Sequence, residues 1–89
     1  MRKVKILVSG RVQGVYFRYF TQNKAKHFAV TGYAKNLADG RVEIVAEAEH
    51  VVLEKFIDWC RKGPMTARVD AIEITELEAG EALASFEIK

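Results

Sequence analysis

The stretch Ser9–Arg18, SGRVQGVYFR, marks the point where the periodicity of the sequence changes. Before it, charged and apolar residues alternate in KVKILVS, as in a strand with Val4, Ile6 and Val8 on one face. After it, aromatic and alanine side chains recur at helical spacing and predict a helix over residues 16–29. The stretch is therefore predicted to be the loop of a β-loop-α unit, and it contains two glycines and two arginines.

A β-hairpin is predicted to follow the first helix. Residues 30–36, VTGYAKN, are rich in strand-forming side chains, and residues 41–48, RVEIVAEA, alternate between charged and apolar. Asp39-Gly40, between the two runs, is a turn dipeptide typical of hairpins.

A second helix and two more strands are predicted in the remaining residues. An apolar stripe that includes Leu53, Phe56 and Cys60 predicts a helix over residues 51–62, which Gly63-Pro64 ends. Strands are expected over residues 67–77 and near the end of residues 80–89, the latter with Phe86 and Ile88 on one side.

This order of elements, βαββαβ plus a short terminal strand, predicts an α+β sandwich of the ferredoxin-like type. Its two helices are expected to share one face of an antiparallel sheet, with the third strand between the first and the second. A right-handed crossover makes the first and second strands point the same way. We therefore expect residues 10–18 and Asn36 to be neighbours at one edge of the sheet.

The composition limits the classes of protein that the chain can represent. With 89 residues, of which 49% are hydrophobic, we expect one domain over residues 1–89. A net charge of +2 gives no electrostatic argument for a nucleic-acid partner. The single cysteine, Cys60, excludes an intrachain disulfide and a cysteine-rich metal site. Since the apolar run near the N-terminus is too short for a signal peptide or a membrane span, a cytoplasmic location is expected.

The loop has the features of an anion site. Gly10 and Gly14 allow backbone angles that turn successive N–H groups inward, and the helix that follows adds the positive end of its dipole. Arg18 would lie in the first helical turn, where its planar guanidinium suits two oxygens of one phosphate. The lysine and Ser/Thr of a nucleotide-binding P-loop are absent. The alternative is that the glycines only turn the chain and the arginines are solvated.

Asn36 also allows two interpretations. It can simply start the turn before Asp39-Gly40, or its amide can donate to a phosphate or position a water.

The sequence resembles the acylphosphatase family over nearly its whole length. The likeness lies in GRVQGVYFR at residues 10–18 and GYAKNLADGRVEIVAE at residues 32–47, and continues in WCRKGPMTARVDAIEI and the closing FEIK. Two departures are mild: Tyr33 stands where the family commonly has tryptophan, and AEAEH replaces a more usual glycine after Glu47.

The resemblance implies metal-independent hydrolysis of the carboxyl–phosphate bond of small acyl phosphates, with no cofactor. It implies that Arg18 and Asn36 are the catalytic residues. It also implies a phosphate cradle made by the backbone of five residues: Arg11, Val12, Gln13, Gly14 and Val15. The expected partners are an acyl phosphate as substrate and inorganic phosphate as product and inhibitor. No nucleic acid or membrane is expected to bind, and a monomer is expected.

This chemistry agrees with the residue types of the loop. A departing carboxylate is stable without a proton, so a site without Asp, Glu, His or Cys can act by positioning and electrostatics alone. Arg18 and the loop N–H groups would bind the phosphoryl oxygens in a loose transition state, and Asn36 would hold the attacking water.

Two alternatives remain. One is an acylphosphatase-like module for carbamoyl-phosphate chemistry within a larger maturation enzyme, although a chain that ends at Lys89 favours a free-standing enzyme. The other is a non-catalytic module of the same fold that binds anions or RNA. RNA-recognition domains carry their aromatic side chains on strands, whereas Tyr16, Phe17 and Tyr19 lie at a helix start.

Overall fold

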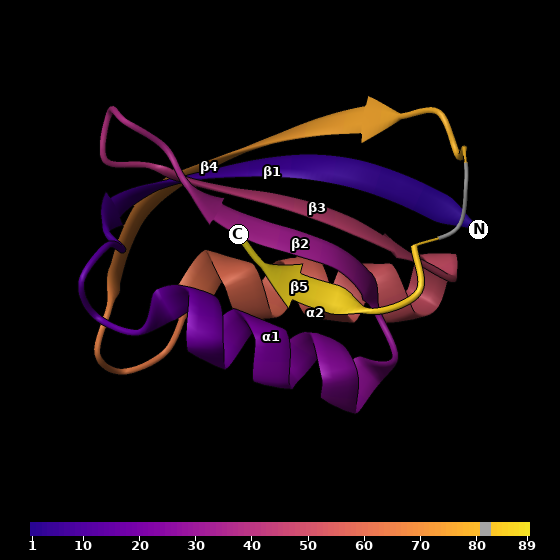
Figure 1. Ribbon diagram of the computed structural model, residues 1–89, viewed down its shortest axis with the longest axis horizontal. Coiled ribbons are helices and arrows are strands. Elements are labelled where there is room, and N and C mark those ends of the chain that lie inside the picture. The colour runs from indigo at the N-terminus through magenta and orange to yellow at the C-terminus, as the bar shows by residue number, and fades with distance from the viewer. Residues whose placement is uncertain (81–82) are drawn as a thin grey trace.

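A five-stranded sheet is covered on one face by two helices in the computed structural model, which describes residues 1–80 and 83–89 (Figure 1). The elements in chain order are β1 (Arg2–Arg11), α1 (Phe17–Phe28), β2 (Thr31–Asn36), β3 (Val42–Ala48), α2 (His50–Lys62), β4 (Arg68–Leu77) and β5 (Phe86–Ile88). The predicted ferredoxin-like order is thus confirmed.

The strands lie in the order β4-β1-β3-β2-β5. β1 pairs antiparallel with both β3 and β4, and β3 pairs antiparallel with β2. These four strands form the predicted antiparallel sheet, with β3 between β1 and β2. The terminal strand β5, whose partner the sequence did not indicate, pairs with β2 in parallel and makes the whole sheet mixed.

The core lies between the helices and the facing side of the sheet. Val4, Ile6 and Val8 of β1 are fully buried there, as the alternating pattern predicted. Ile72 and Ile74 of β4 are partly buried against the same core. The other fully buried large side chains include Phe17, Val42, Ile44, Leu53, Phe56 and Cys60.

Both helices end within one residue of their predicted limits. Tyr16 and Ala29, which flank α1, have left-handed backbone angles with φ of 61° and 58°, so the helix is one residue shorter at each end than predicted. α2 begins at His50, one residue earlier than expected, and ends before Gly63, whose N–H donates to Trp59 O at 2.8 Å.

Within the part of the chain that the structure describes, no helix is long and apolar enough to cross a membrane.

Close approach of β4 requires a glycine at the end of β1. The register between these strands shifts at Ser9/Gly10, where Asp70 is the extra residue on β4. Gly10 has φ of 130°, and a Cβ there would collide with Arg68 O and lie 2.8 Å from Asp70 N. The extra residue makes a β-bulge in β4, beside the end of β1 from which the loop to α1 starts.

The crossover brings three segments to one end of the molecule. Figure 1 shows the loop after β1, the turn between β2 and β3, and the start of α1 at the left.

Within the turn between β2 and β3, the Asp39 carboxylate accepts hydrogen bonds from Arg41 N at 3.0 Å and Arg41 Nε at 2.8 Å. The predicted hairpin turn at Asp39-Gly40 is therefore confirmed, with Gly40 at φ of 95°.

Candidate active site

The loop between β1 and α1 is fixed to the core by two valines. Val12 is 1% exposed and Val15 is 9% exposed, and Val15 O accepts a hydrogen bond from Thr66 Oγ1 at 2.8 Å. Between them lies Gly14, with φ of 75° and nothing within 4 Å of a Cβ built on it. A glycine is thus favoured at position 14 because the backbone there is left-handed, and not because a larger side chain would lack room.

Gln13 ties this loop to the β2–β3 hairpin. Its Nε2 donates to Leu37 O at 2.8 Å and to Arg41 O at 2.9 Å. Leu37 directly follows Asn36, and Arg41 lies across the turn, where its O also accepts a hydrogen bond from Leu37 N at 2.8 Å. The Gln13 side chain therefore links the loop to the two ends of the turn that follows Asn36. Sequence reasoning considered only the backbone of Gln13, because the two carbonyl groups become its partners only after the strands pair.

Arg18 lies in the first turn of α1 and is partly buried. Its Nη1 donates to the main-chain oxygen of Lys89 at 2.6 Å, and Lys89 N donates to Ala34 O at 2.8 Å. The residue that follows β5 therefore orients the guanidinium. None of the side-chain ion pairs among the described residues includes Arg18.

Asn36 is the last residue of β2, on the side of the sheet that faces the helices, where Gly32 and Ala34 are buried. Its Oδ1 is buried and has no hydrogen-bond partner among the described residues. A buried acceptor left unpaired costs about 1–3 kcal/mol. The free oxygen can therefore accept a hydrogen bond from a donor that enters the adjoining pocket.

One pocket of about 360 Å³ contains both residues. Its lining residues are Val12, Gly14, Tyr16, Phe17, Arg18, Tyr19, Asn36 and Ile88. The predicted convergence of the loop, Arg18 and Asn36 at one edge of the sheet is thus observed.

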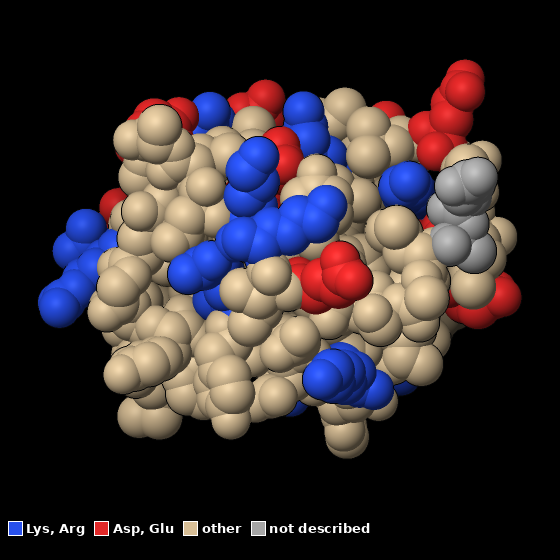
Figure 2. Space-filling view, in the orientation of Figure 1, with Lys and Arg blue, Asp and Glu red and all other residues tan. Residues whose placement is uncertain are grey.

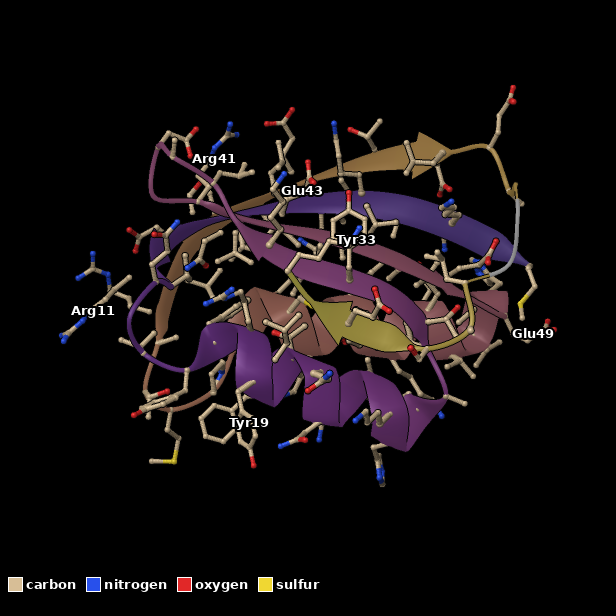
Figure 3. All side chains as sticks on the ribbon, in the orientation of Figure 1. Arg11, Tyr19, Tyr33, Arg41, Glu43 and Glu49 are labelled. Carbon is tan, nitrogen blue, oxygen red and sulfur yellow. The ribbon has the colours of Figure 1, made fainter. Side chains whose placement is uncertain are left out.

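Three other residues of the predicted cradle lie outside this lining. Gln13 directs its side chain to the hairpin, and Val15 directs its side chain to the core. Arg11 is exposed at the end of β1, opposite Arg68, and its side chain points away from the molecule in Figure 3.

The pocket is suited to an anion. Among the described residues that line it, Arg18 alone is charged, and none is acidic, His or Cys. Among the residues that the structure describes, no group of three or more His, Cys, Asp or Glu could hold a metal ion. The face drawn in Figure 2 shows Lys and Arg side chains gathered near its centre. Such a site can bind a phosphoryl group and stabilise its charge.

Tyr16, Tyr19 and Ile88 are lining residues that sequence reasoning did not assign to the site. The exposed aromatic residues at the helix start were the only signal for the two tyrosines. For Ile88 no signal existed, because its place depends on the pairing of β5 with β2.

Comparison with known proteins identifies the family. The sequence model of the acylphosphatase family matches residues 4–88. The chain is 47% identical to the acylphosphatase of Shewanella amazonensis, over 99% of this chain and 97% of that protein. The crystal structure of acylphosphatase from Bacillus subtilis superposes with a TM-score of 0.95 at 40% identity, over 100% of this chain and 99% of that one.

A much longer protein contains a similar domain. T. kodakarensis HypF matches with a TM-score of 0.86 and 38% identity, over 100% of this chain but only 12% of HypF. The family match and the full-length relatives together show that this chain belongs to the acylphosphatase family.

Proposed function

We propose that this acylphosphatase hydrolyses the carboxyl–phosphate bond of small acyl phosphates with Arg18 and Asn36 as its catalytic residues, in one domain over residues 1–89. The observation that carries the proposal is that Arg18 and Asn36, 18 positions apart in the sequence, line the same pocket. The products are a carboxylate and inorganic phosphate.

Arg18 and the backbone N–H groups of residues 11–15 bind the phosphoryl oxygens. The Nη1 of Arg18 already donates a hydrogen bond to Lys89 O. The other N–H groups of its planar guanidinium can contact two oxygens of one phosphate. The N-terminal end of α1 adds positive potential at the same place. These groups stabilise the charge that spreads over the phosphoryl oxygens in a loose transition state.

Asn36 positions the attacking water. Its buried Oδ1, which has no hydrogen-bond partner among the described residues, accepts a hydrogen bond from the water and aims the water oxygen at phosphorus. A bond forms between the water oxygen and phosphorus while the bond to the acyl oxygen breaks, and the carboxylate leaves with that electron pair. The water proton passes to a phosphate oxygen. No general acid is needed, because the leaving carboxylate is stable as an anion.

Phosphate release from benzoyl phosphate in the presence of a metal chelator tests this function. We expect rapid release, with competitive inhibition by inorganic phosphate. The same assay on Arg61→Ala, which removes an exposed arginine of α2, is the control for a general loss of positive charge. No release above the uncatalysed rate would refute the proposal.

A second candidate function is the use of carbamoyl phosphate within a longer protein. The match to 12% of T. kodakarensis HypF favours it, because the match shows that such a domain also exists as a part of a larger chain. The kcat/KM for carbamoyl phosphate, compared with that for benzoyl phosphate, separates the two candidates.

RNA binding has less support. RNA-recognition domains of this fold stack bases on strand aromatics, whereas the two central strands β1 and β3, RKVKILVSGR and VEIVAEA, contain none. A shift in RNA mobility at micromolar protein would revive this alternative.

We also propose that the protein acts as a cytoplasmic monomer without nucleic-acid or membrane partners. This proposal is supported by the small net charge of +2, because so small a charge attracts polyanions such as nucleic acids only weakly. Light scattering should return a mass close to the 10.1 kDa of one chain.

A further inference from the structure

A second pocket lies on the helical side of the molecule, where α1 and α2 pack against each other (Figure 1). It has a volume of about 350 Å³, and its lining residues are Phe20, Asn23, Lys24, His27, Trp59 and Pro64. None of these six residues lines the pocket that contains Arg18 and Asn36. The volume is sufficient for a small molecule, since such sites commonly measure about 300–1,000 Å³.

The sequence of α1 places four of these side chains on one face of the helix. They occupy positions i, i+3, i+4 and i+7, namely Phe20, Asn23, Lys24 and His27. Residues at this spacing follow one another along a single stripe. The stripe is about 10 Å long, because each residue of a helix adds about 1.5 Å. It begins with an aromatic side chain and continues with polar ones.

The other wall of the pocket comes from the end of α2. Trp59 lies in the last turn of α2 and is partly buried, and Pro64 follows that end. The Trp59 ring packs on Phe17, with ring centroids 6.2 Å apart, and Phe17 is one helical turn before Phe20. The aromatic part of the pocket therefore lies near the start of α1, and its polar part lies further along the helix.

The polar part is suited to a negative charge. Lys24 is cationic, and none of the six described lining residues is acidic. None of the side-chain ion pairs among the described residues includes Lys24, whose Nζ lies 5.7 Å from the centroid of the Phe28 ring. Asn23, directly before Lys24, is exposed, and its amide can donate to an oxygen. A ligand that has an apolar ring and an anionic end would match both parts.

We infer that this second pocket binds small aromatic carboxylates, with the ring against Phe20 and Trp59 and the carboxylate at Lys24. Contact of the ring with two aromatic side chains removes apolar surface from water, and the carboxylate gains a cation and an amide as donors. Aromatic side chains alone would also attract a quaternary ammonium ion, but Lys24 repels one. The inference does not rest on the proposed function, because it uses no lining residue of the first pocket.

Fluorescence of Trp59 measures binding directly, because Trp59 is the single tryptophan of the chain. Titration with phenylacetate should shift its emission to shorter wavelength, with a dissociation constant of about 1 mM. Acetate, which lacks the ring, should bind about tenfold more weakly. Phenylacetamide, which lacks the charge, should bind about fivefold more weakly. Benzyltrimethylammonium has the ring with the opposite charge and should cause no shift.

Matched variants locate the bound phenylacetate. Lys24→Met removes the charge at similar length and should weaken binding about fivefold, as should loss of the ring in Phe20→Ala. Lys26→Met is the control, because Lys26 is an exposed lysine of the same helix outside the pocket, and it should keep the full affinity. Arg18→Ala should also keep it, since phenylacetate held in the first pocket would lose its cation there.

The remaining outcomes overturn the inference. No shift in the unchanged protein, equal affinities in Lys24→Met and Lys26→Met, or loss of binding in Arg18→Ala would each do so. Binding of benzyltrimethylammonium as tight as that of phenylacetate would show that charge plays no part. Circular dichroism checks that each variant is folded, and calorimetry with phenylacetate confirms each affinity independently of the fluorescence.

Discussion

At the scale of single residues, Arg18 and Asn36 share a pocket but offer different chemistry. Arg18 supplies a positive charge that Lys89 O holds in place, whereas Asn36 supplies a buried amide oxygen to which no described residue donates a hydrogen bond. A charged donor is expected to act on the phosphoryl group in both the bound substrate and the transition state. A neutral acceptor is expected to act on the water. Variants at these two positions should therefore affect KM and kcat differently.

Arg18→Ala should abolish phosphate binding and turnover together. The variant removes the only charged side chain among the described residues that line the pocket, and the loss of one such donor to a developing anion lowers the rate by about 10²–10³-fold. We expect KM for benzoyl phosphate and the inhibition constant of phosphate to rise as kcat falls. An unchanged KM would contradict the role of Arg18 as the phosphate clamp.

Asn36→Ala should lower kcat by roughly 10²-fold and leave phosphate affinity nearly unchanged, since the attacking water loses its acceptor while the anion keeps its donors. Steady-state kinetics with phosphate as inhibitor measures both quantities. If phosphate binding weakens strongly instead, Asn36 is a binding residue.

Gln13→Met should loosen the link between the loop and the hairpin. Methionine matches glutamine in length but cannot donate to Leu37 O and Arg41 O. Loss of the two hydrogen bonds should lower the free energy of unfolding by about 1–2 kcal/mol. Because Arg18 and Asn36 lie on the two segments that Gln13 joins, kcat should also fall roughly tenfold.

Urea unfolding and kinetics on the same Gln13→Met preparation test both parts. Gln22→Met is a useful control, since Gln22 Nε2 donates to Phe86 O at 2.9 Å, and Phe86 pairs with Gly32 of β2 and not with the turn between β2 and β3. A variant at Gln13 that loses stability but keeps kcat would limit this residue to a structural role.

At the scale of elements, the periodicity of the sequence predicted the strands and helices because side-chain burial follows it. In β1, Val4, Ile6 and Val8 are fully buried in the core and the intervening residues are not. The stripe of Leu53, Phe56 and Cys60 is likewise the buried side of α2. Here the local pattern and the tertiary packing demand the same residues, so no other information was needed.

The pairing of β5 could not be predicted from such a pattern. Three residues, Phe86–Ile88, form it, and only Phe86 is buried. Its place beside β2 depends on which sheet edge is open once β3 lies between β1 and β2. The hydrogen bond from Arg18 to Lys89 and the position of Ile88 in the pocket follow from this pairing, which explains why sequence reasoning missed both.

Gly10→Ala should destabilise the β1–β4 pair far more than Gly40→Ala destabilises the hairpin turn. Both glycines have positive φ, of 130° and 95°, but only at Gly10 would a Cβ collide with a neighbouring backbone. We expect a loss of more than about 2 kcal/mol for Gly10→Ala and about 1 kcal/mol for Gly40→Ala. Equal losses in urea unfolding would show that backbone angle alone matters at Gly10.

At the scale of the whole molecule, the topology places the site. β1 and β2 both pair antiparallel with β3, so the end of β1 and the end of β2 meet at the same edge. This convergence was predictable from the order of elements and the handedness of the crossover. The orientation of Arg18 was not, because it depends on an oxygen 71 residues away along the chain.

Stability at alkaline pH also depends on the molecule as a whole, through two groups whose protonated forms the fold favours. Complete burial raises the pKa of the Cys60 thiol above its ordinary value of 9.0. Burial, followed by the hydrogen bond to Glu43 at 2.9 Å, raises the pKa of the Tyr33 hydroxyl above 10.0. Figure 3 shows Tyr33 and Glu43 together on the side of the sheet away from the helices.

Both shifts have the same sign, so the free energy of unfolding should be constant at neutral pH and fall as pH rises. Since the folded chain holds each proton more tightly, the unfolded chain loses it first. The decline should therefore begin near pH 9, the ordinary pKa of the thiol, at about 1.4 kcal/mol per pH unit for the fully buried Cys60 and with a smaller contribution from the partly exposed Tyr33 above pH 10. Urea unfolding from pH 7 to 11 measures this decline.

Two variants separate the contributions of the two groups. In Cys60→Ala the decline should begin about one pH unit higher, near the ordinary pKa of 10.0 for Tyr33, whereas in Tyr33→Phe the decline that begins near pH 9 should remain. An onset that Cys60→Ala leaves unchanged would mean that other groups cause the decline.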